Sequence, residues 1–387
     1  MQKYYDRLIR CDIFCFVIDN FGDIGVCLRL ALQLAHEYDW QVQLFVNDLR
    51  TFARLLPDIR IDATHQMVNG IVIKHWDIQI NNFIDVADVV IEAFACELPE
   101  TYIAMMARRA KKPVWINLEY LSAEDWVANF HLRQSPHPRY ALIKTFFFPG
   151  LSSGSGGVIK ERDLDARFTA FKDDIDAQNV WWRTLTMSLP SPPLNSTVIS
   201  LFVYENPAIN ALLTQWRDGS EQIVLLVSEG YISRIIACFF GIDTFGARSY
   251  VKAGNIVVYG LEFFPQAEYD KILWVSDLNF VRGEDSFVRA QWAARPFIWN
   301  IYPQTYDAHL PKLNAALLHV SSGLSSESLI AFKRFWHALN GLGMPDWKDF
   351  WSHRVALEAN AIFWANKLKA IGDLTGNLVE YVKSQLK

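Results

Sequence analysis

The chain opens with a strand, a glycine-punctuated turn and a helix, and the turn carries two carboxylates. Residues 12–18 are mostly β-branched and aromatic, and a helical pattern of apolar residues begins at Val26. Asp19 and Asp23 stand in the turn between these segments. In parallel α/β domains, ligands bind beyond the carboxyl end of a strand, where unpaired N–H groups of the next helix point. The pattern therefore predicts a binding site that contains both aspartates.

Two carboxylates in this turn restrict the ligand. A dinucleotide site would have glycines here, because carboxylates repel a pyrophosphate. A cationic or proton-donating acceptor would instead be attracted. The alternative is structural, since an acid at a helix N-terminus stabilises the helix by about 0.3–1 kcal/mol. Helix capping needs one such side chain, and Asn20 could supply it, so capping leaves the second acid unexplained.

Strand and helix patterns alternate along most of the chain, which is typical of parallel sheets covered by helices on both faces. Strands are expected at 10–18, 40–46, 70–75, 86–94 and 112–118, and again at 197–204, 222–227, 255–259, 271–275 and 296–301. Between them, helices are expected at 26–37, 51–56, 99–109, 207–217, 233–240 and 286–293. The tail after Leu324 has helical spacing of its apolar residues. This outline is that of a GT-B type α/β protein, with two facing Rossmann-like domains and a helical C-terminal tail.

A proline-rich segment, residues 189–196, breaks every regular pattern and is the expected interdomain linker. We therefore expect an N-terminal acceptor domain over 1–188 and a C-terminal donor domain over 189–387, with C-terminal helices packing back on the first. A length of 387 residues fits two domains. The glycine-serine run at 152–157 is expected to be a flexible surface loop rather than a ligand cradle.

Charge and cysteine content exclude several classes of protein. With 37 basic and 42 acidic residues, the chain is not a general nucleic-acid binder. The five cysteines have no metal-ligand spacing and are expected to be buried thiols in a reducing compartment. No signal peptide and no run of eighteen apolar residues is visible, so we expect a cytoplasmic protein with no membrane partner.

A second strand–turn–helix motif lies at residues 279–292. Gly283 permits a tight turn, and Asp285 or Ser286 can cap the helix that follows. With Arg282 beside them, the N–H groups of this helix would bind a diphosphate. Glu284 is unusual there, because a carboxylate near phosphate is unfavourable unless it bonds sugar hydroxyls or takes part in the chemistry. The alternative is a well-capped structural helix with a solvated arginine.

Aromatic residues follow two other strands of this half. Phe263 and Gln266 come after one strand, and Phe202 and Tyr204 end another. Aromatic rings in such positions can stack on a nucleobase, each stack contributing roughly 1–3 kcal/mol. Each ring taken singly is better explained as core. Several at strand ends beside an anion site favour a nucleotide-sugar pocket.

Several long motifs resemble those of the EarP family, bacterial protein-arginine rhamnosyltransferases that modify translation elongation factor P. The matching motifs are DNFGDIGV at 19–26, NLEYLSAE at 117–124, SPHPR at 135–139, KTFFFPG at 144–150, FVYEN at 202–206, FFPQAEYD at 263–270 and RGEDSFVRAQWA at 282–293. They follow the family's order over most of the chain. Leu28 departs from the family pattern, where a tryptophan is expected, and no motif matches in the helical tail.

The resemblance implies an inverting, metal-independent glycosyltransferase without a cofactor, which moves rhamnose from dTDP-β-L-rhamnose to one arginine of elongation factor P. It implies acceptor activation by Asp19 and Asp23, with Asp23 the candidate base, and an essential carboxylate at Glu284. It further implies thymine or ribose contacts at Phe202, Tyr204, Phe263, Gln266 and Tyr269, diphosphate contacts at Arg282, Gly283, Asp285 and Ser286 with Tyr302 nearby, and sugar contacts at Asn20, Phe21 and Gly22.

Paired acids suit an arginine acceptor. A guanidinium has a pKa of about 13.8, so its full deprotonation at neutral pH would cost roughly 9 kcal/mol. Two carboxylates can orient it and accept a proton late in the reaction. No Asp-X-Asp triplet stands at a strand–turn position, since those at 163–165 and 174–176 lie in stretches expected to be helical.

Two other functions stay open from the sequence. One is a GT-B glycosyltransferase or nucleotide-sugar epimerase that acts on a small molecule. The other is a non-enzymatic module that binds a nucleotide sugar or a translation factor. A binding module gives no reason for the acids at both motifs. For a protein acceptor, we expect the recognition surface to include residues 135–139.

Overall fold

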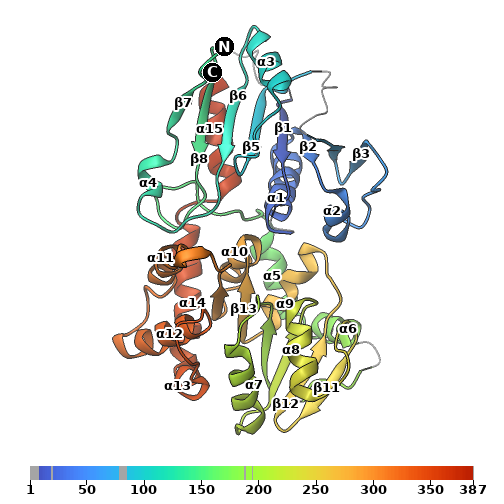
Figure 1. The fold of residues 1–387 in the computed structure, drawn as a ribbon, viewed down its shortest axis with the longest axis vertical. Helices are drawn as coiled ribbons and strands as arrows, with labels where there is room; N and C mark the ends of the chain where they lie inside the picture. Colours follow the sequence, from blue (N-terminus) through green and yellow to red (C-terminus); the bar gives the residue numbers. More distant parts are fainter. Residues whose placement is uncertain (1–7, 19–20, 78–84, 187–188, 194, 387) are drawn as a thin grey trace. The chain divides into compact units, whose positions relative to one another are not determined.

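The computed structural model describes residues 8–18, 21–77, 85–186, 189–193 and 195–386 (Figure 1). Contacts divide the chain into two compact units, residues 1–162 with 369–387, and residues 163–368. The division falls between Arg162 and Asp163, whereas the sequence analysis placed it between 188 and 189. The reason is that helix α5 (Leu164–Asp173) packs against α9 (Gln266–Val275), within the second unit.

The first unit is built on an eight-stranded sheet in the order β3-β4-β2-β1-β5-β6-β8-β7. Its six central strands are parallel, and β3 and β7 pair antiparallel at the two edges. The strands are β1 Arg10–Cys15, β2 Gln41–Val46, β3 His65–Val68, β4 Ile71–His75, β5 Val89–Ala93, β6 Val114–Leu118, β7 Gln134–Pro136 and β8 Ile143–Phe147. The helices are α1 Phe21–Tyr38, α2 Leu49–Leu55, α3 Glu100–Arg108, α4 Val127–Phe130 and α15 Leu374–Leu386. Parallel central strands bring the carboxyl ends of β1, β5, β6 and β8 to one edge.

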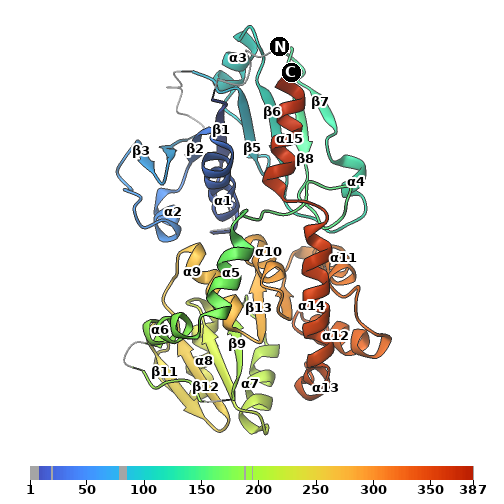
Figure 2. The same ribbon diagram turned by 180° about the vertical axis from the view of Figure 1, so that it is seen from behind.

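The last helix of the chain, α15, completes this first unit. It packs beside α1 and against β6, and Figure 2 shows it on the same face of the sheet as α1. Thr375 Oγ1 donates a hydrogen bond to Gln33 Oε1 (2.6 Å), and Tyr381 and Thr145 share one through their hydroxyls (2.8 Å). Leu378, with its apolar neighbours on the helix, is fully buried.

The glycine-serine segment is part of this packing, so the expectation of a flexible surface loop was wrong. Gly156 and Gly157 are buried, and a Cβ on Gly156 would lie 2.4 Å from the Phe147 ring. Gly157 has φ +75°, and a Cβ there would lie 2.5 Å from the carbonyl oxygen of Gly372. Glycine is required because the backbone of the C-terminal segment passes so close.

Asp12, on β1 of the first sheet, has a fully buried carboxyl group. Its Oδ2 accepts hydrogen bonds from the Tyr102 hydroxyl (2.5 Å) and the Ala87 N–H (3.3 Å), while Oδ1 has no partner among the described residues. Burial raises the pKa of Asp12 from 3.8 to about 6, although both hydrogen bonds act in the opposite direction. The folded protein therefore binds this proton more tightly than the unfolded chain.

Asp12→Asn should consequently stabilise the protein at neutral and alkaline pH, by about 1–3 kcal/mol. The contribution of Asp12 to stability is complete below pH 4 and is lost as the pH rises through 6. Asparagine keeps an acceptor for Tyr102 and carries no charge to desolvate. Urea unfolding at pH 4.5 and at pH 8 measures the effect. A difference between variant and wild type that does not change with pH would contradict it.

The second unit has a six-stranded sheet in the order β11-β12-β10-β9-β13-β14, parallel except for edge strand β11. Its strands are β9 Thr197–Leu201, β10 Ile223–Val227, β11 Tyr250–Ala253, β12 Ile256–Gly260, β13 Leu278–Arg282 and β14 Phe297–Asn300. Its helices are α5, α6 Ile175–Thr186, α7 Ala208–Asp218, α8 Tyr231–Phe240, α9, α10 Glu284–Trp292, the short η1 Thr305–Asp307, α11 Leu310–Val320, α12 Ser326–Ala338, α13 Trp347–Ser352 and α14 Arg354–Lys369.

Two details of the second unit bear on the predictions. Residues 271–275, expected as a strand, continue helix α9 and bury Ile272, Leu273 and Trp274 against the sheet. A short apolar run fits a buried helix as well as a strand, which explains the error. The helical tail expected after Leu324 is present as α12 to α15. No helix in the described part of the chain has the length and apolar character needed to cross a bilayer.

Candidate functional site

Asp23, in the first turn of α1, is held in a fixed position. Asp23 is only 1% exposed. Its Oδ2 accepts a hydrogen bond from the backbone N–H of Ile18 (2.8 Å), and its Oδ1 accepts one from the Tyr120 hydroxyl (3.1 Å). The carboxylate is therefore held by two hydrogen bonds, one from the segment just after β1 and one from the segment after β6. Asp19 and Asn20 lie outside the described residues, and the roles predicted for them stay predictions.

Phe21 and Gly22 begin α1, next to Asp23. Both are half-buried, and the Arg54 guanidinium lies 5.4 Å from the centre of the Phe21 ring. Such a cation–π contact fixes the ring at the start of the helix. Phe21 and Gly22 thus lie beyond the carboxyl end of β1, and the sugar contacts predicted for them stay predictions.

Sequence reasoning assigned no role to Tyr120, although it lies within the NLEYLSAE motif. The residue follows β6, whose carboxyl end lies at the same edge of the sheet as that of β1. Tyr120 is separated from Asp23 by 97 residues in sequence. A polar side chain just after a central parallel strand was the signal that could have found it.

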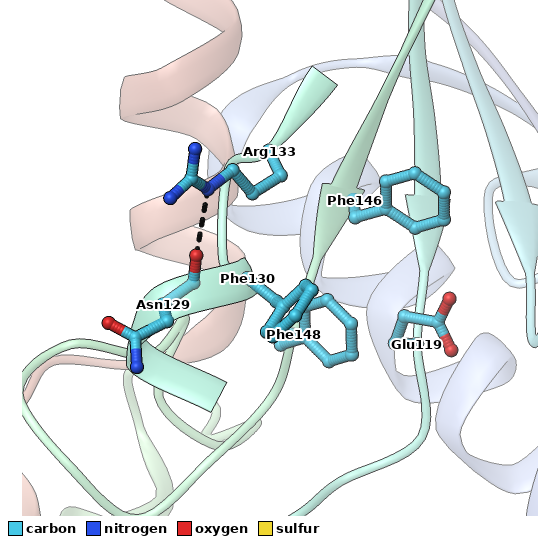
Figure 3. A pocket seen from close by; sticks show the side chains of 6 residues that line it. All are labelled: Glu119, Asn129, Phe130, Arg133, Phe146 and Phe148. Carbon is cyan, nitrogen blue, oxygen red and sulfur yellow. Dashed lines mark hydrogen bonds between the residues drawn. The ribbon is translucent and has the colours of Figure 1, made fainter. Parts of the chain in front are cut away.

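A cavity of about 520 Å³ lies at the ends of β6 and β8, and Glu119 in its lining precedes Tyr120 in sequence. It is lined by the side chains Glu119, Asn129, Phe130, Arg133, Phe146 and Phe148, and Figure 3 shows three phenyl rings around it. Arg133 Nε donates a hydrogen bond to the carbonyl oxygen of Asn129 (2.8 Å), and this bond fixes the Arg133 side chain at the edge of the cavity. Burial, and next the charge of Glu92, raise the pKa of Glu119. This volume and apolar lining are typical of a binding pocket.

In the second unit, neighbouring strands β9 and β13 bring the second predicted cluster together. The Arg282 guanidinium, at the end of β13, lies 4.3 Å from the ring centre of Phe202 and 4.8 Å from that of Tyr204. Arg282 Nη1 also donates to the carbonyl oxygen of Val203 (3.4 Å). Tyr302, 60% exposed, meets the Tyr204 ring edge-on at 5.3 Å. The two rings hold the cation beyond the carboxyl ends of the strands.

Helix α10 begins directly after this cation. Gly283 has φ +67°, a conformation that favours glycine, and its carbonyl oxygen accepts from Trp299 Nε1 (3.2 Å). Ser286 is buried, and its hydroxyl donates to the carbonyl oxygen of Arg282. Gln266, the first residue of α9, donates to Asp285 Oδ2 (3.3 Å). The N-termini of α9 and α10 are thereby tied together.

The remaining predicted donor residues border the same region. Tyr269 on α9 meets the Phe202 ring edge-on at 6.1 Å, and burial, and next the charge of Asp285, raise the pKa of its hydroxyl. Glu284 is the first residue of α10 and is half-buried. Phe263 is half-buried in the segment before α9. The predicted substrate contacts of all of them stay predictions.

The diphosphate contact predicted for Arg282 implies that Arg282→Ala weakens binding of thymidine diphosphate by about 10- to 100-fold, since a charge-assisted hydrogen bond contributes about 1.5–3 kcal/mol. Titration calorimetry with the purified chain measures this. Arg334→Ala is the matched control, because Arg334 lies on α12 of the same unit and its side chain is 63% exposed. Equal affinity in wild type and Arg282→Ala would remove Arg282 from the donor site.

Within the described ranges, no three His, Cys, Asp or Glu side chains are grouped so as to hold a metal ion. The triplets at 163–165 and 174–176 lie at the starts of α5 and α6, in agreement with the helical expectation. The described part of the first cluster supplies a held carboxylate, Asp23, and the second supplies a held cation, Arg282, beside helix N-termini.

Comparison with known proteins identifies the class. A solved structure of the spinosyn rhamnosyltransferase SpnG has a TM-score of 0.51 at 9% identity, over 97% of this chain and all of the other. At that identity the likeness concerns the fold alone. Two parallel-rich sheets with a helical C-terminal region define a GT-B glycosyltransferase fold, as predicted.

The particular family follows from more similar proteins. A solved structure concerning EarP-mediated arginine glycosylation of translation elongation factor EF-P has a TM-score of 0.68 at 27% identity, over 97% of this chain and 99% of the other. A protein-arginine rhamnosyltransferase of Pseudomonas putida is 39% identical over 380 residues, which is 97% of this chain and 99% of that protein. The model of the family "Elongation-Factor P (EF-P) rhamnosyltransferase EarP" matches residues 11–383. The chain belongs to this family and is an enzyme, a glycosyltransferase of the protein-arginine rhamnosyltransferase class.

Proposed function

We propose that this enzyme transfers rhamnose from dTDP-β-L-rhamnose to the guanidinium group of a specific arginine of translation elongation factor P. The transfer inverts the configuration at the sugar carbon, needs no metal, and activates the factor. The observation that carries the proposal is the near full-length match to the elongation factor P rhamnosyltransferases, residues 11–383. The two clusters support it, because each supplies what one half of this reaction requires.

The acceptor half requires a carboxylate that is already oriented. An arginine side chain is charged and its lone pairs are delocalised, so it attacks only if one nitrogen is aligned and its proton is taken late. Asp23, fixed by Ile18 N–H and Tyr120 hydroxyl, is the base in this proposal. Asp19 is the second carboxylate, which orients the guanidinium by hydrogen bonding.

The donor half requires stabilisation of the leaving thymidine diphosphate. Negative charge grows on the diphosphate as the bond between the sugar carbon and phosphate oxygen breaks. Arg282 and the N–H groups at the start of α10 supply positive charge and hydrogen-bond donors for it. The aromatic side chains Phe202 and Tyr204, which hold Arg282, make the apolar side of the nucleotide site. Glu284 contacts the sugar in this proposal.

The aromatic cavity supports a protein acceptor. Glu119 in its lining directly precedes Tyr120, which binds Asp23, and we propose that the cavity belongs to the acceptor side of the site. We propose that an apolar side chain near the acceptor arginine enters it. Edge strand β7, with residues 134–136 exposed, borders the same part of the sheet and includes part of the predicted recognition segment 135–139.

Phe130→Ala should therefore raise KM for the protein acceptor by about 5- to 10-fold, the loss expected from one partly buried aromatic contact. KM for the sugar donor should stay unchanged. Phe130 is 54% exposed, so its removal should leave the unfolding temperature unaltered. Phe363→Ala on α14, 50% exposed, is the matched control. An unaltered KM for the protein would exclude the cavity from acceptor binding.

The proposal is tested by incubating the purified enzyme with dTDP-rhamnose and elongation factor P. Intact mass spectrometry should find a gain of one deoxyhexose, and peptide fragmentation should place it on an arginine. Nuclear magnetic resonance of the product should report the inverted anomeric configuration. Consumption of the donor with no change in the protein would instead favour a small-molecule acceptor or an epimerase.

A further inference from the structure

Asp23 is held by groups that come from distant parts of the first unit. The Ile18 N–H belongs to the turn that precedes α1, whereas the Tyr120 hydroxyl comes from the segment after β6. The turn alone can fix one carboxylate oxygen. The Tyr120 hydroxyl fixes the other oxygen, and so determines the rotation of the carboxylate about the Cβ–Cγ bond of Asp23.

Tyr120 is in turn held by an unusual loop. Its ring stacks on Phe94, with centroids 4.4 Å apart and planes inclined by 18°. Phe94, Ala95 and Glu97 all have positive φ, at 57°, 52° and 54°. Non-glycine residues rarely adopt this conformation, and clusters of them occur where a loop is held for function.

Packing on both sides maintains this loop. The Phe94 N–H donates to the carbonyl oxygen of Leu118 (2.7 Å), two residues before Tyr120, and the Phe94 ring is 8% exposed. Cys96 Sγ lies 3.4 Å from the carbonyl oxygen of Phe14 on β1. The loop after β5 thus connects the two segments that carry Tyr120 and Asp23.

We infer that Tyr120 is a positioning residue for the transfer reaction: it orients the carboxylate of Asp23, and Phe94 fixes Tyr120 for that purpose. The inference rests on the proposed function, in which Asp23 takes the proton from the acceptor guanidinium. Because Oδ1 accepts from the Tyr120 hydroxyl and Oδ2 from the Ile18 N–H, the plane of the carboxylate is fixed. An acceptor nitrogen then meets the base without a search over rotamers.

The test is the variant Tyr120→Phe, which keeps the ring and its stack on Phe94 and removes only the hydroxyl. The turnover number for rhamnose transfer to elongation factor P should fall about 10- to 100-fold, while KM for donor and acceptor and the unfolding temperature stay near wild type. Tyr381→Phe is the matched control, because its hydroxyl bonds Thr145 in the same unit.

A double-mutant cycle separates positioning from a structural role. In the background Asp23→Asn, the change Tyr120→Phe should have no further effect on the turnover number, because both act through one carboxylate. A lower unfolding temperature with unchanged turnover, or effects that simply add, would overturn the inference. Failure of the wild type to modify elongation factor P would overturn the proposed function and this inference together. Normal wild-type transfer with full turnover in Tyr120→Phe would overturn this inference alone.

Discussion

Asp23→Asn should lower the turnover number for rhamnose transfer by about 10²- to 10⁴-fold, the usual contribution of a positioned base. The change is nearly isosteric, and the asparagine oxygen can still accept from Ile18 or Tyr120. The fold should therefore survive, and the affinity for thymidine diphosphate, whose proposed site lies in the second unit, should be unchanged. Single-turnover kinetics with elongation factor P measures the effect.

Asp48→Asn provides a matched control for this experiment. Asp48 is the N-cap residue of α2, whereas Asp23 lies in the first turn of α1, and Asp48 Oδ1 accepts from the N–H groups of Arg50 and Thr51. Asparagine caps helices as well as aspartate does, so this variant should be fully active and stable. A fall in turnover for Asp48→Asn equal to that of Asp23→Asn would refute the assignment of Asp23 as base.

Arg289→Ala should lower the free energy of unfolding by about 3–5 kcal/mol, the loss expected when one partner of a buried ion pair is removed. Arg289 on α10 binds Asp270 on α9 through two hydrogen bonds, of 2.8 and 2.6 Å, and both side chains are 1% exposed. The alanine variant leaves the Asp270 carboxylate buried without its cation. Guanidinium unfolding followed by tryptophan fluorescence measures the loss.

Two further variants make this result specific. Asp270→Leu combined with Arg289→Met should recover most of the lost stability, because no unpaired charge then remains in the core. Arg334→Ala breaks an exposed pair with Asp349 and should change stability by less than about 1 kcal/mol. If the double variant is as unstable as Arg289→Ala, packing rather than the charge explains the loss. The same two helices carry Gln266 and Asp285, two residues of the proposed donor site.

The sequence predicted most elements of the fold because their signals are local. Strands β1 and β13 are each followed by a helix, α1 and α10, as the spacing of apolar residues predicts. Residues 271–275 were misassigned, because five apolar-rich residues fit either type of element. The return of α15 to the first unit was predicted as packing of the C-terminal helices, but its partners Gln33 and Thr145 have no signal in sequence.

The candidate site was predictable where neighbours in space are neighbours in sequence. Arg282, Gly283 and Ser286 lie in one turn, and they were grouped correctly by sequence. Phe202 and Arg282 meet only because β9 and β13 are adjacent in the sheet, an order that periodicity does not determine. The bond between Tyr120 and Asp23 depends in the same way on strand order.

The return of the C-terminal segment has a consequence for biosynthesis. Gln33 near one end of the chain bonds Asp373 and Thr375 near the other, and Gly157 has no side chain where Gly372 passes. Residues 369–387 are synthesised after the rest of their unit, and until they emerge the first sheet has an uncovered apolar strip where Leu378 and Val382 pack. The second unit, residues 163–368, can therefore fold before the first unit is complete. Nascent chains stalled before residue 369 should therefore bind chaperones through residues 1–162.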